Sequence, residues 1–539
     1  MYLYSNGTDF LISKKEVACL PSDFMFSTGD SILFGYAFVE GRHFKNEIIN
    51  NAGFDYIKNN NIDISGIFCC VSGQQGSLEI IVDPLLQFNI FFYAHGDCYL
   101  VSSNIDVMLK VIGVNNLTYN KDYLFDQFAY QSPMRGGTIF NEITLLTFDD
   151  LKGTSPVSKI NFKDLSDFLK IHKPHYNKYN DLSYESLLMI YIERLNNRAK
   201  VISDKFSEVH IQLTGGADSR LVMSAFQKFE NTFAYVYGNG ENQNRLIFEE
   251  LTRARAIKKV SEIKLVGKPL NSPATICKGL IDTSFLKLNN LNTYMNASFD
   301  ESDKVCKVTG YYGANVCGGV VLPPENTIEN PRLSLIPSEC FTYHDYVAKF
   351  KEININKRKA SFSDLFYINN RGKSHYASHS LADNKNINSV DILYDYINIL
   401  LVDKCPYPDV MIDKNAISID LISLNDHQLA LFPYDSRKIP KYRDFDNIPI
   451  INCFDGYNFL SRDLENFKVS HPVLNIGLDE IYEGFNAFGT IKDMLGSKAF
   501  DDFFNEHSYF GYLRNKNDIQ AGIFLYYCIS VVYFNSLKK

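Results

Sequence analysis

The chain has 539 residues, which is too long for a single ordinary core and predicts two or three domains. A composition of 45% hydrophobic and 22% charged residues is typical of a soluble globular protein. The formal net charge of −8 and the lack of clustered Lys and Arg argue against a nucleic-acid groove or an anionic membrane surface. We therefore expect no nucleic-acid partner and no membrane partner.

The eleven cysteines are odd in number and scattered, with Cys69 and Cys70 adjacent and no pair spaced by two residues. This pattern favours free thiols in a reducing compartment over disulfides or zinc. The N-terminus lacks a basic segment followed by an apolar core, so no secretory signal is expected. The longest apolar run, 521–534, is too short to span a bilayer and is predicted to be a buried helix. The expected location is the cytoplasm.

Residues 31–154 are predicted to be rich in short β strands. Apolar or alternating runs separated by turn residues predict strands at 32–39, 66–72, 78–82, 88–94 and 99–103. Asn104 can cap a helix that runs through Leu109. An antiparallel, layered β domain with few helices follows from this pattern.

Residues 156–185 contain Pro156 and Pro174 and show little periodicity, so they are predicted to be a connector. An amphipathic helix is expected at 183–198, where apolar residues recur at helical spacing.

The stretch 208–226 has the pattern of a strand, a glycine turn and a helix. Residues alternate in polarity up to Leu213, Gly215 and Gly216 break the run, and apolar residues then recur at helical spacing. Such a junction can bind an anion, because glycines leave no Cβ between backbone and ligand and the first N–H groups of the helix have no partner within it.

Three polar side chains flank this turn. Thr214 and Ser219 supply hydroxyl groups, and Asp218 places a carboxylate where a bound phosphate would lie. A carboxylate beside a phosphate is stable when a metal lies between them, so Mg²⁺ is implied. The Lys-Ser/Thr pair of the Walker loop is absent, and an ordinary strand-to-helix turn without function is the alternative.

Further strands and helices follow in alternation. The predicted elements are a strand at 232–237, a helix at 242–257 and a strand at 262–266. This rhythm predicts a parallel sheet with right-handed crossovers. Ligands bind outside the carboxyl ends of such strands, so Leu213 and Thr214 should lie near Tyr237 and Gly238.

Another strand, beginning at Val305, also ends in a glycine-rich turn. Gly310, Tyr311 and Gly313 belong to this turn, which can form a second backbone nest for pyrophosphate. Its end should converge with the 213–219 turn.

These turns resemble two loops of the asparagine synthetase family. The 214–219 turn is similar to the Ser-Gly-Gly-x-Asp-Ser pyrophosphatase loop, with Thr214 in the first Ser place. The later turn is similar to the family's Gly-x-Gly-x-Asp-Glu-x-x-Gly-Gly loop, but Ala314 and Asn315 take the Asp and Glu places. Either the Asn315 amide oxygen and Asp218 hold Mg²⁺ with ATP, or the site is damaged.

The N-terminal strand order resembles the family's glutaminase domain, including a strand that ends in Asp83. In that family the nucleophile is a cysteine exposed at the N-terminus by removal of Met, with its α-amine as base. Here Tyr2 takes that place and no cysteine precedes Cys19. The resemblance therefore implies a degenerate glutaminase-like (Ntn) domain with a structural or docking role.

The last third is mostly helical in pattern. Asp391 and Asp395 lie in a segment similar to the family's helix on the acceptor-substrate side, which implies a catalytic role for Asp391. Lys438 resembles the family's lysine that faces the adenylate; Lys441 is a rival, and a solvated basic turn is the alternative.

One histidine pair in this third has metal-like spacing. His375 and His379 lie four residues apart, but no third ligand is evident nearby, which favours ordinary histidines over zinc.

The resemblance implies an α/β fold in three parts after the connector is set aside. These are the glutaminase-like domain at 1–155, a doubly wound parallel-sheet ATP-pyrophosphatase domain (adenine nucleotide α-hydrolase-like) at 186–445 and a helical extension at 446–539. Relatives of this family include β-lactam synthetase and lasso-peptide cyclase. A homodimer or a biosynthetic partner protein is compatible with it.

The implied activity is an AMP-forming, ATP-dependent amide ligase. It would adenylate a small-molecule or peptide carboxylate and transfer it to an amine or to ammonia, without its own glutaminase. A catalytically inactive binding or scaffold protein is the main alternative, supported by Tyr2, Ala314 and Asn315. A tRNA-modifying pyrophosphatase is disfavoured by the acidic charge and the lack of a cysteine pair that could carry sulfur.

Overall fold

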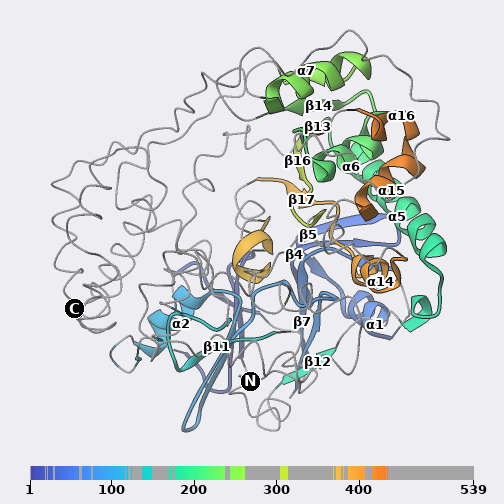
Figure 1. The fold of residues 1–539 in the computed structure, drawn as a ribbon. Helices are drawn as coiled ribbons and strands as arrows, with labels where there is room; N and C mark the ends of the chain where they lie inside the picture. Colours follow the sequence, from blue (N-terminus) through green and yellow to red (C-terminus); the bar gives the residue numbers. More distant parts are fainter. Residues whose placement is uncertain are drawn as a thin grey trace, which may run out of the picture.

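The described part of the chain is a mixed α/β structure, with two mainly antiparallel sheets early and a parallel sheet later (Figure 1). This computed structural model describes residues 2–147, 169–260, 304–313, 368–381, 387–406 and 416–434, with shorter gaps inside some of these ranges. The predicted order of a β region followed by a parallel α/β region is confirmed.

The first sheet has six described strands, and each pairs antiparallel with its neighbours. In sheet order these are β11 (Ile143–Leu145), β9 (Phe91–His95), β10 (Cys98–Ser102), β2 (Phe10–Ser13), β1 (Tyr2–Ser5) and β3 (Met25–Ser27). Strands β1, β2 and β3 precede residue 31, where the predicted strands begin, and were not predicted. Helix α2 (Ile105–Ile112) follows β10, and its predicted cap is confirmed because the Asn104 side chain accepts the N–H of Asp106.

The second sheet is antiparallel except at one edge. Its strands are β12 (Leu169–His172), β8 (Ser77–Val82), β7 (Phe68–Gln74), β4 (Ser31–Val39) and β5 (Arg42–Ile49), with β6 (Ile64–Ser65) also paired to β4. Strand β12 pairs parallel to β8. It lies within the stretch predicted to be a connector, so part of that stretch extends the second sheet. Helix α1 (Asn51–Asn59) follows β5.

The two early sheets share one hydrophobic core. Phe10 of β2 meets Phe34 of β4 with ring centroids 5.1 Å apart, and it stacks on Phe88 at 6.4 Å. All three side chains are buried. These contacts place the inward faces of the two sheets against each other, as the alternating apolar pattern predicts for layered β structure.

The third sheet is parallel throughout. Its order is β15 (Lys258–Lys259), β14 (Thr232–Tyr235), β13 (Glu208–Gln212), β16 (Val305–Thr309) and β17 (Ser389–Asp391). The short strand β15 pairs with β14, whereas the strand predicted at 262–266 lies outside the described residues. Strand β17 was not predicted.

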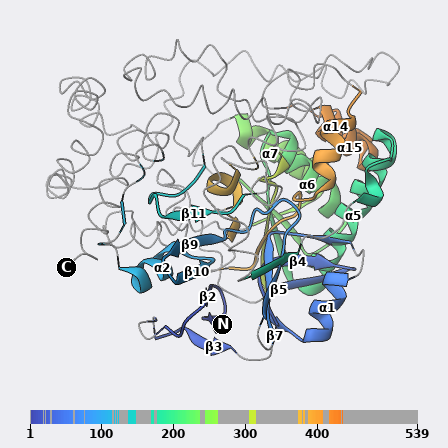
Figure 2. The ribbon, with the colours of Figure 1, turned by 90° about the horizontal axis from the view of Figure 1, so that it is seen from below.

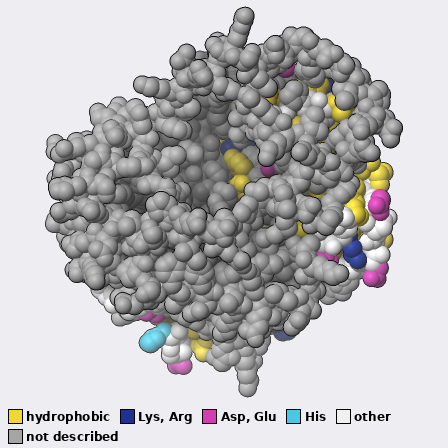
Figure 3. All heavy atoms as spheres, in the orientation of Figure 1, with side chains coloured by type: hydrophobic (Ala, Val, Ile, Leu, Met, Phe, Trp, Pro, Cys, Tyr) yellow, Lys and Arg dark blue, Asp and Glu magenta, His cyan; other side chains and the backbone are white. Residues whose placement is uncertain are grey.

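Helices pack on this sheet or on one another. They are α5 (Tyr184–Lys205), α6 (Ala217–Phe226), α7 (Gln243–Ala254), α14 (Ile397–Lys404), α15 (Ala416–Asn425) and α16 (His427–Ala430). Short turns of helix lie at Asn177–Tyr179 and, in π form, at Lys373–Ala377. Seen from below, α6, α7 and α15 lie on the side of the molecule away from the early sheets (Figure 2). On the flank that carries α5, hydrophobic, acidic and basic side chains are mixed (Figure 3).

Among the described helices, none combines the length and the hydropathy needed to cross a membrane.

Candidate functional site

The carboxyl ends of three neighbouring parallel strands meet at one edge of the third sheet. Strand β13 pairs in parallel with β16, and β16 pairs with β17. The residues that leave these strands are therefore neighbours: Leu213 after β13, Gly310 after β16 and Asp391 at the end of β17. The predicted convergence of the 213–219 turn with the turn after β16 is confirmed.

The glycine turn after β13 is held closed by its two hydroxyl side chains. The Ser219 hydroxyl accepts the N–H of Thr214 at 3.0 Å and lies 3.0 Å from the Thr214 hydroxyl. Thr214 Oγ1 in turn accepts the N–H of Gly216 at 3.2 Å. The two hydroxyls predicted to flank the turn thus act together to fix its backbone.

Helix α6 begins directly after this turn. Gly216 is its N-cap, and as a glycine it supplies no side-chain hydrogen bond to the first turn. Asp218 lies in that first turn and is partly exposed. A helix N-terminus without a side-chain cap, at the carboxyl edge of a parallel sheet, favours a bound anion.

The turn after β16 packs directly on Asp218. A Cβ atom built on Gly313 would lie 2.2 Å from Asp218 Cγ, so only a glycine allows this approach. At Gly310 a Cβ would lie 2.9 Å from a methyl group of Val222 in α6. The two glycine-rich turns are therefore parts of one site, and its glycines are needed for close approach.

Asp391 lies in a strand, so its predicted place in a helix is wrong. The short segment Ser389–Asp391, with the β-branched Val390 at its centre, pairs here with β16 instead of forming a turn of helix. The Asp391 carboxylate is buried and accepts the N–H groups of Tyr312 at 2.9 Å and Leu393 at 3.1 Å. Through the hydrogen bond from Tyr312, the Asp391 carboxylate holds the backbone of the turn after β16.

The pKa of Asp391 is raised from 3.8 to about 7, chiefly by burial, with a contribution from the neighbouring Asp218 carboxylate. Backbone hydrogen bonds, the one from Tyr312 first, act in the opposite direction. The two carboxylates therefore repel each other across the edge, and a cation between the strands would relieve that repulsion.

Tyr312 ties the site to the early sheets. Its side chain is fully buried, and its hydroxyl donates to Gln87 Oε1 at 2.6 Å. Gln87 is held in turn by Asp83, whose carboxylate accepts the Gln87 N–H at 2.9 Å. Between them Leu86 has φ of 51°, a left-handed conformation that costs a leucine roughly 1–2 kcal/mol. The surrounding contacts hold this turn in a strained shape.

Two further tyrosines bridge the same regions. The Tyr36 hydroxyl of β4 donates to the Asp391 carbonyl at 3.2 Å and accepts the Asp391 N–H at 3.1 Å. The Tyr394 hydroxyl donates to Asp83. Burial raises the pKa of both hydroxyls, so both remain protonated donors.

Arg220, directly after Ser219, anchors a later segment of the chain. Its side chain is fully buried, donates to the Phe432 carbonyl at 2.7 Å and lies 3.8 Å from the centre of the Tyr434 ring. Arg220 therefore holds the segment that leads toward Lys438 against α6.

Four of the predicted site residues lie outside the described residues: Tyr237, Gly238, Asn315 and Lys438. The same holds for Ala314, Lys441 and His379. Leu213, Thr214, Gly215, Gly216, Asp218, Ser219, Gly310, Tyr311, Gly313 and Asp391 are described, and all lie in the converging turns and strand ends. Tyr311 stacks on Tyr376 with ring centroids 5.8 Å apart.

Within the described ranges, no group of three or more His, Cys, Asp or Glu side chains is placed to hold a metal. A Mg²⁺ site does not need such a group, because Mg²⁺ takes most of its ligands from substrate phosphates and water. The single carboxylate of Asp218 is therefore compatible with Mg²⁺. Burial raises the pKa of the Cys69, Cys70 and Cys306 thiols, so none of these three is an activated nucleophile.

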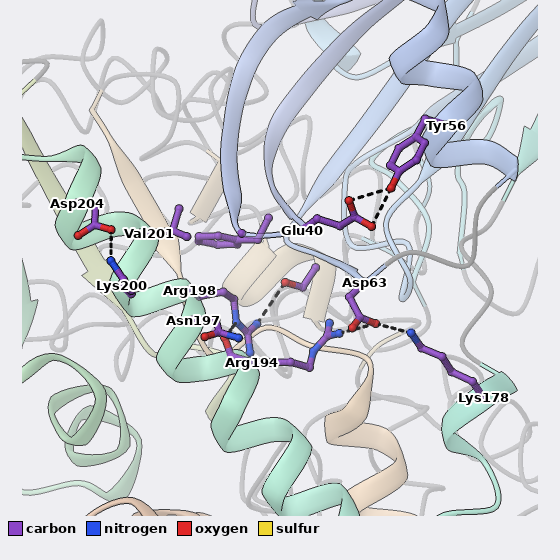
Figure 4. Close-up of a pocket in the computed structure, with 13 residues that line it drawn as sticks. Glu40, Tyr56, Asp63, Lys178, Arg194, Asn197, Arg198, Lys200, Val201 and Asp204 are labelled. Carbon is purple, nitrogen blue, oxygen red and sulfur yellow. Dashed lines mark hydrogen bonds and ion pairs between the residues drawn. The ribbon is translucent and has the colours of Figure 1, made fainter.

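A separate open cavity of about 830 Å³ lies between the β4–β5 hairpin and α5 (Figure 4). Its lining is rich in charge, but the charges pair with one another. Arg194 lies 3.0 Å from Asp63 and 2.8 Å from Asp395, and Lys200 pairs with Asp204. None of the residues predicted from sequence lines this cavity.

The bridging residues Tyr36, Gln87, Tyr312 and Tyr394 were missed from sequence, because an isolated tyrosine or glutamine in an apolar stretch carries no local signal of a distant partner.

No protein-family model matches the chain, and no curated protein matches its sequence.

Proposed function

We propose that this chain is an ATP-dependent, AMP-forming amide-bond synthetase of the asparagine synthetase type. It adenylates a substrate carboxylate and transfers the acyl group to an amine or to ammonia. In this proposal the early sheets are a degenerate glutaminase-like (Ntn) domain, and the parallel-sheet region is an ATP-pyrophosphatase domain. ATP and Mg²⁺ are the required cosubstrate and metal, and the protein acts in the cytoplasm.

One observation carries the proposal. The glycine turn at 215–216 opens α6 at the carboxyl edge of the parallel sheet, and Asp218 in its first turn packs against Gly313 of the next strand's turn. Anion-binding backbone and a metal-binding carboxylate are thereby combined at the edge where parallel sheets bind ligands. Only their combination at one point distinguishes this turn from an ordinary strand-to-helix connection.

Each element of the turn has a task in this proposal. The N–H groups at the start of α6 bind the β- and γ-phosphates, and the Thr214 and Ser219 hydroxyls keep the turn in shape. The Asp218 carboxylate is the proposed Mg²⁺ ligand, with the Asn315 amide oxygen as the second. Lys438 is the proposed contact to the adenylate, and Arg220 holds the segment that leads to it.

The reaction proceeds in two displacements. A substrate carboxylate oxygen bonds to the α-phosphorus while the bond to the pyrophosphate oxygen breaks. The amine nitrogen then bonds to the activated carbonyl carbon, AMP leaves, and the nitrogen loses a proton. Mg²⁺ would offset the negative charge that develops on pyrophosphate.

The nitrogen comes from a free amine, from ammonia or from the substrate itself, because the early sheets supply no glutaminase nucleophile in this proposal. Supporting this, Tyr2 forms part of strand β1, and its ring stacks on Tyr4 at 6.3 Å. The buried thiols of Cys69 and Cys70 are held protonated by burial. A buried environment of this kind disfavours the thiolate form that a nucleophilic attack requires.

The decisive experiment is calorimetric titration of the purified protein with Mg²⁺–ATP, followed by ATP–pyrophosphate exchange with a panel of carboxylates. The parent protein should bind Mg²⁺–ATP and catalyse exchange with at least one carboxylate. Asp218→Ala should reduce exchange by about 100-fold or more, because it removes the metal ligand and so the stabilisation of the leaving group.

Tyr2→Ala is the matched control, since it alters the place of the glutaminase nucleophile and leaves the nucleotide turn intact. Its exchange and its ammonia- or amine-dependent amide formation should equal those of the parent. Full exchange by Asp218→Ala would refute the metal assignment. Failure of the parent to bind Mg²⁺–ATP at all would favour the inactive scaffold, the alternative that the Ala314 and Asn315 substitutions support.

A further inference from the structure

Tyr312 is fixed at both ends by groups from different parts of the chain. Its backbone N–H donates to Asp391 Oδ2 at 2.9 Å, and its hydroxyl donates to Gln87 Oε1 at 2.6 Å. The side chain is fully buried, and its ring meets Tyr394 edge-on at 4.6 Å. The position of Tyr312 therefore depends on both the third sheet and the early sheets.

The Gln87 carboxamide is oriented before it meets Tyr312. Its Nε2 donates to the carbonyls of Leu85 at 3.1 Å and Ile368 at 3.0 Å, so both N–H bonds are used. The oxygen is left to accept from Tyr312, and this assignment satisfies the whole side chain. A fully satisfied buried network of this kind specifies one geometry more sharply than apolar packing does.

The turn that carries Gln87 is itself rigid. The buried Asp83 carboxylate accepts the N–H groups of Gln87 at 2.9 Å and Phe88 at 2.7 Å. Leu86, which lies between Asp83 and Gln87 in the sequence, is held with φ of 51°. A strained residue persists only where its surroundings determine the backbone conformation, so this turn is a fixed support.

The neighbour of Tyr312 in sequence is Gly313, on which the Asp218 side chain packs. A Cβ on Gly313 would lie 2.3 Å from Asp218 Oδ1, so no slack exists between them. A shift of Tyr312 must therefore move Gly313, and with it the space available to Asp218. The support from the early sheets reaches the proposed metal ligand through two adjacent residues.

We infer that the early β sheets set the geometry of the nucleotide site, with Tyr312 as the positioning residue held between Gln87 and Asp391. The effect on ATP binding rests on the proposed function. The positioning of the 311–313 turn by the early sheets does not depend on that function. This positioning gives the early sheets a task that needs no glutaminase chemistry.

The test is Tyr312→Phe, which removes one hydroxyl and keeps the ring. Tyr184→Phe is the matched control, because the Tyr184 hydroxyl is also buried and donates to Asp420 at 3.0 Å, between α5 and α15. Hydrogen–deuterium exchange should rise about tenfold at the amides of residues 311–313 in Tyr312→Phe and stay at the parent level there in Tyr184→Phe. The Kd for Mg²⁺–ATP should increase about tenfold in Tyr312→Phe and less than about twofold in Tyr184→Phe.

Gln87→Met supplies a second variant of similar size that removes the acceptor. It also removes the two hydrogen bonds that Nε2 donates to Leu85 and Ile368, so hydrogen exchange at the same amides should rise at least as much as in Tyr312→Phe. Adding Tyr312→Phe to it should raise exchange there little further, since the hydrogen bond between Tyr312 and Gln87 is already lost. Parent-like exchange at 311–313 in Tyr312→Phe would overturn the inference. If the parent itself bound no Mg²⁺–ATP, the proposed function would fail, while the exchange comparison would still decide whether the early sheets position this turn.

Discussion

The early β sheets and the later parallel sheet place their polar groups in different ways. In the connection between β8 and β9 of the early sheets, the polar side chains of Asp83 and Gln87 are completely buried and hydrogen-bonded within the protein. At the edge of the parallel sheet, Thr214, Asp218 and Ser219 are partly exposed. The polar groups near the early sheets hold the shape of the chain, whereas those at the edge of the parallel sheet remain accessible where we propose that a ligand binds.

Strand direction explains the difference. Neighbouring antiparallel strands end at opposite edges, so their carboxyl ends are spread over two sides of a sheet. In the parallel sheet β13, β16 and β17 all end at one edge, and the turns that follow them come together. The proposed nucleotide site therefore lies at the edge of the parallel sheet, and the early sheets are its proposed support.

The largest effect is expected when one glycine in each region is replaced by alanine. Gly313→Ala adds a methyl group 2.2 Å from Asp218 Cγ, so the Asp218 side chain must move. We expect a loss of roughly 1–3 kcal/mol in the free energy of unfolding from this overpacking. Affinity for Mg²⁺–ATP, measured by calorimetry, should fall about tenfold or more, because the proposed metal ligand Asp218 is displaced.

Gly73→Ala in β7 is the control for that variant. Its new methyl group would meet only a Leu78 methyl at 3.6 Å, an ordinary contact. Stability should change by less than about 1 kcal/mol, and Mg²⁺–ATP affinity should not change. Equal affinities of the two variants would break the distinction between a ligand-facing region and a supporting one.

The second test uses pH. Because burial raises the pKa of Asp391 from 3.8 to about 7, the folded protein keeps a proton that the unfolded chain releases between these values. This group therefore makes the protein less stable as pH rises from about 4 to about 7. At neutral pH it lowers the free energy of unfolding by on the order of 4 kcal/mol relative to about pH 4, by linkage.

Asp391→Asn removes this titration. Urea denaturation of the parent and the variant between pH 4.5 and 7.5 should show a difference in unfolding free energy that shifts in favour of the variant as pH rises. Subtracting the two profiles cancels the other carboxylates, including Asp83, whose pKa is also raised by burial. Parallel profiles would mean that Asp391 is charged or neutral to the same extent in both states.

The smallest effect is expected from thiol modification. Cys69, Cys70 and Cys306 are buried, whereas Cys98 is exposed at the start of β10. Iodoacetamide at neutral pH, followed by peptide mass mapping, should modify Cys98 and leave the other three unmodified until the protein is unfolded. Rapid modification of Cys69 or Cys70 in the folded protein would reveal an activated thiol in the early sheets and contradict their supporting role.

Local sequence pattern determined several features of this protein. Polarity alternation and glycine placement located β13, the turn and α6, because each depends on contacts between residues a few positions apart. The order of an antiparallel region before a parallel one also followed from the spacing of strands and helices. Asp218 could be placed at a helix N-terminus for the same reason.

Only the tertiary structure decided how the regions join. The Tyr312 hydroxyl forms a hydrogen bond with Gln87, 225 positions away in the sequence. The Tyr36 hydroxyl forms one with Asp391, 355 positions away. Such bonds form only once two separately built sheets have docked, so no local period encodes them. Asp391 shows the same limit, since its short stretch became a strand through pairing with β16, a contact that overrides local propensity.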